Sequence, residues 1–101
     1  MELEVYVYRH KERKDIFIHV YEINGWDGDC FCDVVCDIDE AEVFCGNDRQ
    51  KCFETWKDKN PEKQFKLRET KEYKRDGWNG KLTKTTELYL KDFEKVTLKE
   101  V

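Results

Sequence analysis

Residues 16–38, IFIHVYEINGWDGDCFCDVVCDI, contain two runs of alternating side chains on either side of a turn. Aliphatic and aromatic residues alternate over residues 16–23, and cysteine or valine alternates mainly with aspartate over residues 29–38. A period of two is typical of a β-strand, and the Asn, Asp and Gly residues at 24–28 favour a turn. The stretch therefore predicts two paired antiparallel strands, over about residues 16–23 and 29–38.

Upstream, the same alternation marks an N-terminal strand. Leu3, Val5 and Val7 alternate with polar and tyrosine residues, and a charged connection over residues 10–15 separates this run from the next. A short polar connection between two alternating runs predicts another antiparallel hairpin. If the aliphatic faces of the two strands coincide, the opposite face collects five side chains: Tyr6, Tyr8, Phe17, His19 and Tyr21.

Downstream, a helix is predicted from Asn47 or Asp48 to about Lys59. Asn and Asp are good N-cap residues, and the residue before Pro61 avoids helical geometry, so the helix should end there. Its apolar side would cover one face of the sheet. That side consists of Cys52, Phe53 and Trp56.

The C-terminal part predicts further strands. Residues 65–73 and 83–90 have strand-like alternation or threonine-rich composition, and a turn is predicted at residues 76–80. A last strand is predicted around Val96 and Leu98, extending toward Val101. Apolar residues at three and four spacing over residues 82–96 leave a helix as the alternative for that segment.

These elements predict one compact α+β domain over residues 1–101, with a mainly antiparallel sheet of five or six strands and one central helix. Hydrophobic residues make up 39% of the chain and aromatic residues 14%, enough rings for a small core. No apolar run is long enough to cross a membrane, and the acidic start does not resemble a signal peptide. We therefore expect no membrane partner.

The five cysteines predict reduced thiols in a cytoplasmic protein. Their odd number and the absence of a signal peptide argue against a disulfide framework. Alternation predicts that Cys32 and Cys36 are buried as small apolar residues. The alternative is a cysteine-liganded zinc-binding module, although an extended strand does not gather four sulfurs around one metal. The cysteines are Cys30, Cys32, Cys36, Cys45 and Cys52.

Charge is divided along the chain. Residues 1–48 carry 13 acidic and 4 basic side chains, whereas residues 49–101 carry 10 acidic and 15 basic ones. Aspartate is depleted in strands, so several aspartates on one strand indicate that the carboxylates have a use. We expect one acidic strand face that binds a basic surface of a partner protein, with Phe31 and Val35 adding apolar contact. The acidic candidates are Asp29, Asp33, Asp37, Asp39, Glu40 and Glu42.

Two turn tryptophans, Trp26 and Trp78, are candidate anchors for the partner, and at least one should be exposed. No catalytic motif or phosphate-binding loop is present, so we expect neither an enzyme nor a cofactor. Such a protein would be an intracellular inhibitor or adaptor. Evenly placed carboxylates could imitate phosphates, which is the logic of DNA-mimic inhibitors, a role that small phage proteins often have.

Basic residues interleaved with aromatics in the C-terminal half could bind single strands. Interspersed acids and a sequence pI of about 5.3 argue against direct nucleic-acid binding and favour a solvated strand face. The interspersed acids are Glu62, Glu69, Glu72 and Asp76.

Overall fold

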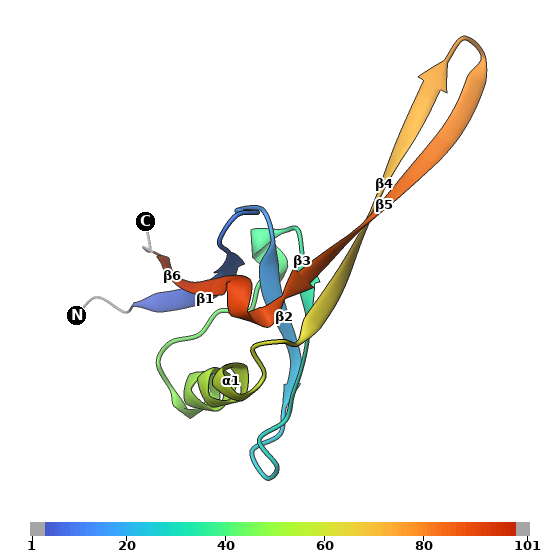
Figure 1. Ribbon diagram of the computed structural model, residues 1–101. Coiled ribbons are helices and arrows are strands. Elements are labelled where there is room, and N and C mark those ends of the chain that lie inside the picture. The colour runs from blue at the N-terminus through green and yellow to red at the C-terminus, as the bar shows by residue number, and fades with distance from the viewer. Residues whose placement is uncertain (1–3, 99–101) are drawn as a thin grey trace.

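A computed structural model describes residues 4–98 of the chain as a helix-covered sheet from which a long hairpin projects (Figure 1). Leu3 and Val101, which the sequence assigned to the first and last strands, lie outside the described residues. The α+β class is confirmed, with six antiparallel strands and one α-helix. The strands form two sheets rather than one, a four-stranded sheet in the body and a two-stranded hairpin.

The four-stranded sheet has the order β3-β2-β1-β6. Its strands are β1 (Val5–His10), β2 (Phe17–Ile23), β3 (Cys30–Val35) and β6 (Phe93–Leu98). Pairing of β1 with β6 brings the two ends of the described chain side by side. The strand predicted near Val96 and Leu98 is therefore confirmed, and its partner is the N-terminal strand.

The faces of β1 and β2 do not match as the sequence suggested. Arg9 pairs with Phe17, and this register places Tyr8 in the main core with Ile16, Ile18 and Val20. Val7 lies on the other face, in a smaller cluster with Phe17 and Ala41. The aliphatic faces therefore do not coincide, because a one-residue change of register moves every side chain of a strand to the opposite face.

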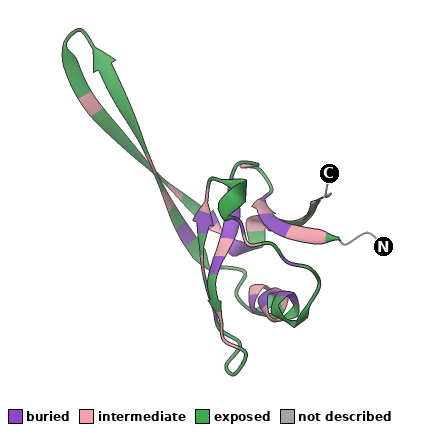
Figure 2. Ribbon diagram, turned by 180° about the vertical axis from the view of Figure 1, so that it is seen from behind, coloured by how far each residue is buried: buried purple, intermediate pink, exposed green. Residues whose placement is uncertain are grey.

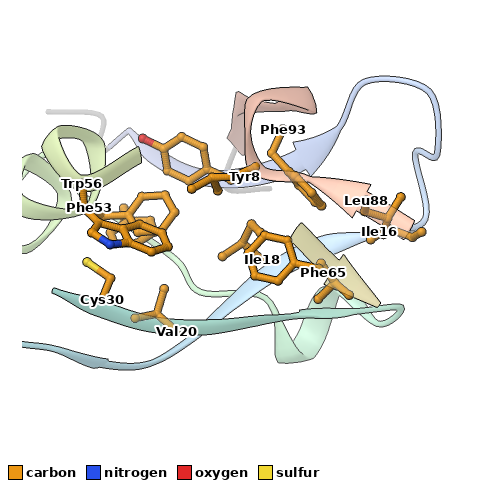
Figure 3. Packing of buried hydrophobic residues seen from close by; sticks show 13 residues of the cluster. Tyr8, Ile16, Ile18, Val20, Cys30, Phe53, Trp56, Phe65, Leu88 and Phe93 are labelled. Atoms are coloured by element: carbon orange, nitrogen blue, oxygen red, sulfur yellow. The ribbon is translucent and has the colours of Figure 1, made fainter. Parts of the chain in front are cut away.

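Helix α1 (Asp48–Lys59) covers the main core, as predicted (Figure 3). The Asn47 side chain accepts a hydrogen bond from the Gln50 backbone N–H, and the Asn60 side chain donates to the Trp56 carbonyl at the other end. Phe53 is fully buried, with its ring 4.8 Å from the Tyr8 ring centroid. Aromatic packing of this kind fixes the helix on the sheet.

The second sheet is a hairpin of β4 (Gln64–Arg75) and β5 (Trp78–Tyr89), which we call the arm. Phe65 and Leu88 anchor its base in the core. Beyond Thr70 its side chains are almost all exposed, and the molecule extends over 57 × 35 × 21 Å (Figure 2). The alternative helix over residues 82–96 is wrong, because β5, a 3-10 turn and β6 occupy that segment.

The arm closes through a two-residue turn. Asp76 and Gly77 have φ values of 51° and 76°, the geometry that matches the twist of paired strands. Trp78 already belongs to β5, so the predicted five-residue turn at 76–80 is shorter than expected. Among the described residues, no helix is long and apolar enough to cross a membrane.

Candidate functional site

The acidic residues do not all share one strand. Strand β3 ends at Val35, and the chain then turns into the 3-10 helix η1 (Ile38–Glu40). The Asp37 side chain accepts a hydrogen bond from the Asp39 backbone N–H, 2.9 Å away, and so caps this helix. The prediction that four aspartates project from a single strand is wrong, because local capping by Asp37 stabilises a turn instead of an extended chain.

The carboxylates nevertheless lie around β3 and η1, all exposed except the half-buried Glu42, and we call this set the acidic surface: Asp29, Asp33, Asp37, Asp39, Glu40 and Glu42. Glu42 pairs with Arg49 at 2.8 Å. Within residues 4–98, no other member of the set forms an ion pair with a basic side chain. The surface therefore keeps an uncompensated negative field. Its unpaired members are Asp29, Asp33, Asp37, Asp39 and Glu40.

Two exposed aromatic residues lie on the outer face of the same hairpin. Alternation places Phe31 and Asp33 on the face of β3 opposite to Cys30 and Val34, which line the core. Phe31 is 57% exposed and pairs with Glu22 of β2, next to a bulge that holds the 66% exposed Tyr21. An exposed aromatic ring offers apolar contact, and the neighbouring carboxylates offer ion pairs. Together they are suited to binding a partner surface that has both apolar and basic groups.

His19 connects the parts of the acidic surface, a role that no sequence pattern predicted. It is the cross-strand partner of Asp33, and its Nδ1 lies 2.6 Å from the Glu40 carbonyl oxygen. Its ring packs edge-on against Tyr21 at 4.8 Å between centroids. His19 thus holds η1 against β2. The contacts of His19 with Asp33 and Glu40 depend on the register of β2 with β3 and on the position of η1 beside β2, and neither is visible in the sequence.

The two predicted tryptophan anchors lie far apart. Trp26 is 100% exposed in the β2–β3 loop, whose backbone is held by hydrogen bonds to the Asn24 and Asp27 side chains. Trp78 is 65% exposed in the arm. The loop and the arm tip lie at opposite ends of the molecule (Figure 1). The predicted exposure is confirmed, but the two rings do not belong to one site.

The cysteines are divided between the core and the surface, and all five are free thiols. Cys30 is buried and Cys32 half-buried, whereas Cys36 is exposed, so the predicted burial of Cys36 is wrong. Cys36 lies after the end of β3, where alternation no longer decides its side. Burial raises the pKa of the Cys30 thiol to about 11 and that of Cys32 to about 12. Among the described residues, no three His, Cys, Asp or Glu side chains form a metal-binding group.

No family model, no curated protein and no solved structure matches this chain. Over residues 4–98 the fold is that of an α+β protein with a four-stranded sheet, a two-stranded arm and one α-helix. Its functional interpretation therefore rests on the chemistry of its own surfaces.

Proposed function

We propose that this protein is a non-catalytic protein-binding protein whose acidic surface engages a basic surface of a partner protein. The observation that carries the proposal is the position of Phe31, an exposed ring beside unpaired carboxylates on the outer face of β3. Exposed charges steer association, and an aromatic residue at the centre of a contact supplies affinity. The combination suits a partner with Lys or Arg residues around an apolar patch.

Mimicry of nucleic acid is one form of this function, and it depends on how regularly the charges are placed. Asp29 and Asp33 flank Phe31 on the hairpin, whereas Asp37 and Asp39 belong to η1. The carboxylates thus lie on two elements and do not form one row along a strand. We therefore propose that the acidic surface binds a basic protein surface in general. The groove of a nucleic-acid-binding protein is one example of such a surface.

The test replaces charge without changing shape. Asn at positions 33, 37 and 39 keeps the side-chain oxygen that accepts from a backbone N–H at Asp33 and Asp37. A matched control with the same charge change elsewhere combines Asp58→Asn, Glu72→Gln and Glu87→Gln, all at exposed positions. A partner captured by the wild type is then titrated calorimetrically against the wild type, the triple variant and the control at two salt concentrations.

We expect the Asp33→Asn/Asp37→Asn/Asp39→Asn variant to bind more than about tenfold more weakly, and its association rate to depend less on salt. The control should bind within about twofold of the wild type. Phe31→Ala should also weaken binding about tenfold while leaving the salt dependence unchanged. Equal affinities of the wild type and the charge variant would overturn the proposal.

A further inference from the structure

The register of the arm sorts its charges onto two different faces. Residues directly opposite each other in an antiparallel pair point to the same side of the sheet. Glu69 pairs with Lys84, Lys71 with Leu82, Tyr73 with Gly80, and Arg75 with Trp78, so these side chains share one face. We call its outer part the tip face. The tip face comprises Lys71, Tyr73, Arg75, Trp78, Leu82 and Lys84.

Few acidic residues lie on or beside the tip face. Glu72 lies on the opposite face of the arm and pairs with Lys81 at 3.9 Å. Glu69 lies at the inner end and pairs with Arg13 of the body at 3.3 Å. Asp76 is in the turn, and Glu62 precedes the arm and pairs with Lys91. The tip face therefore carries three cations, and the one carboxylate that borders it is Glu69, which lies opposite Lys84 and is paired with Arg13.

The same face presents two exposed rings. Tyr73 is 44% exposed and Trp78 65% exposed. The ring of Trp78 lies over Gly80, where a Cβ would come within 2.7 Å of the ring carbon Cη2. Gly80 thus leaves room for the ring to rest across the backbone of β5. A ring supported in this way is a preformed platform for stacking.

We infer that the tip face binds single-stranded nucleic acid. Along β4 the order is cation, ring, cation, at Lys71, Tyr73 and Arg75, with alternate residues about 6.8 Å apart. A single strand alternates anionic phosphates with flat bases that are free to stack, so it matches both groups at once. A second copy of this chain also places Asp29, Phe31 and Asp33 at alternate positions, but its other carboxylates lie on η1, and self-association is the competing result that the test below distinguishes.

The acidity of the whole chain does not oppose this binding at the tip. Of the acids that lie among the basic residues of β4, Glu72 points to the opposite face and Glu69 is paired with Arg13. Salt screens charge over about 8 Å at physiological ionic strength. The arm extends well beyond that distance, because twelve extended residues span about 40 Å. Phosphates at the tip therefore encounter mainly the charges of the arm itself, where Lys71, Arg75 and Lys84 outnumber Asp76.

The test measures fluorescence anisotropy of a labelled thymidine homopolymer of about 20 nucleotides, long enough to cover the arm. The tip variant combines Lys71→Gln, Arg75→Gln and Lys84→Gln. The matched control combines Lys66→Gln, Arg68→Gln and Lys74→Gln on the opposite face of the same hairpin. Both remove two lysines and one arginine, and circular dichroism verifies that both variants fold.

We expect the wild type to bind at about 50 mM salt and to lose affinity toward about 200 mM. The tip variant should bind at least about tenfold more weakly, with the salt dependence of log K reduced by about 2, since each phosphate contact to a single strand contributes roughly 0.7. The control should retain most of the affinity. Tyr73→Val, which keeps a strand-forming residue, should weaken binding several-fold without changing the salt dependence.

Three results would overturn the inference. They are absence of binding at low salt, equal losses in the two triple variants, and tighter binding of a duplex of the same length. The remaining alternative is that the tip face binds a second copy of this chain, and sedimentation of the protein alone measures that self-association. Self-association that the tip variant abolishes, without oligonucleotide binding by the wild type, would assign the tip face to a second copy. None of these results depends on the partner of the acidic surface.

Discussion

The two hairpins of this protein carry the same turn sequence pattern but end differently. Residues 24–28 read Asn-Gly-Trp-Asp-Gly, and residues 76–80 read Asp-Gly-Trp-Asn-Gly. Between β2 and β3 the pattern forms a wide loop, in which Gly28 has a φ of 73° and Trp26 extends into solvent. Between β4 and β5 only Asp76 and Gly77 turn, and the tryptophan joins the strand. Strand pairing, not the turn motif, determines the length of the loop.

The surroundings of the two hairpins differ as well. The β2–β3 hairpin packs its inner face against α1, whereas most of the arm packs against nothing in the described chain. The arm carries seven basic and four acidic residues over Gln64–Tyr89. The acidic surface lies on β3 and η1. Opposite charges therefore occupy separate regions, one stabilised by a core and the other by cross-strand contacts.

The largest effect that separates the hairpins should come from core burial. Phe53→Ala removes a fully buried ring that stacks on Phe44 at 5.2 Å and packs on Tyr8. We expect the free energy of unfolding to fall by about 3–5 kcal/mol. Leu82→Ala, at a 55% exposed position of the arm, should change it by less than about 0.5 kcal/mol. Urea denaturation measures both, and comparable losses would contradict the division into covered and uncovered hairpins.

Alkaline pH should weaken the body through its buried thiols. Burial, followed by the neighbouring Cys52 and Asp29, raises the pKa of Cys30 from 9.0 to about 11. The unfolded chain therefore ionises first, so the free energy of unfolding falls as pH rises from about 9 to about 11, by roughly 2 kcal/mol for this group. Cys30→Ala should reduce this pH dependence in denaturation curves by about that amount, and Cys32, with a pKa of about 12, should maintain the rest. Cys45→Ala, at an exposed position, should leave the slope as it is.

Matched glycines in the two turns should respond differently. Gly77 has a φ of 76°, whereas Gly25, at the same place in the other pattern, has no positive φ. Gly77→Ala should destabilise the arm by about 1–2 kcal/mol and speed amide hydrogen exchange in β4 and β5 by about tenfold or more. Gly25→Ala meets no atom within 4 Å and should leave exchange unchanged. An equal response would show that both turns use the same geometry.

The smallest effect concerns the two tryptophans. Trp26→Ser removes a fully exposed ring and should shift the free energy of unfolding by less than about 0.5 kcal/mol. Trp78→Ser uncovers Gly80 and should loosen the arm by about 0.5–1 kcal/mol. Hydrogen exchange of the β5 amides distinguishes the two variants. Protection of β5 that survives Trp78→Ser would mean that the ring does not support the strand.

The sequence by itself determined the local elements of this protein. Alternation identified the strands around Ile18 and Val34, and the Asn47 cap with Pro61 fixed the ends of the helix. The prediction that at least one of Trp26 and Trp78 is exposed was also confirmed, with Trp26 fully exposed in its loop. These predictions succeeded because capping, proline geometry and strand periodicity depend on neighbours within a few residues.

Only the tertiary structure decided which faces meet. Tyr8 rather than Val7 enters the main core, Cys36 leaves the end of β3, and Trp78 and Leu82 join Lys71 and Tyr73 on one face of the arm. Each outcome depends on a register or a strand end, and a shift of one residue reverses the side of every side chain without changing local propensity. The composition of the acidic surface and of the tip face was therefore set by pairing between strands.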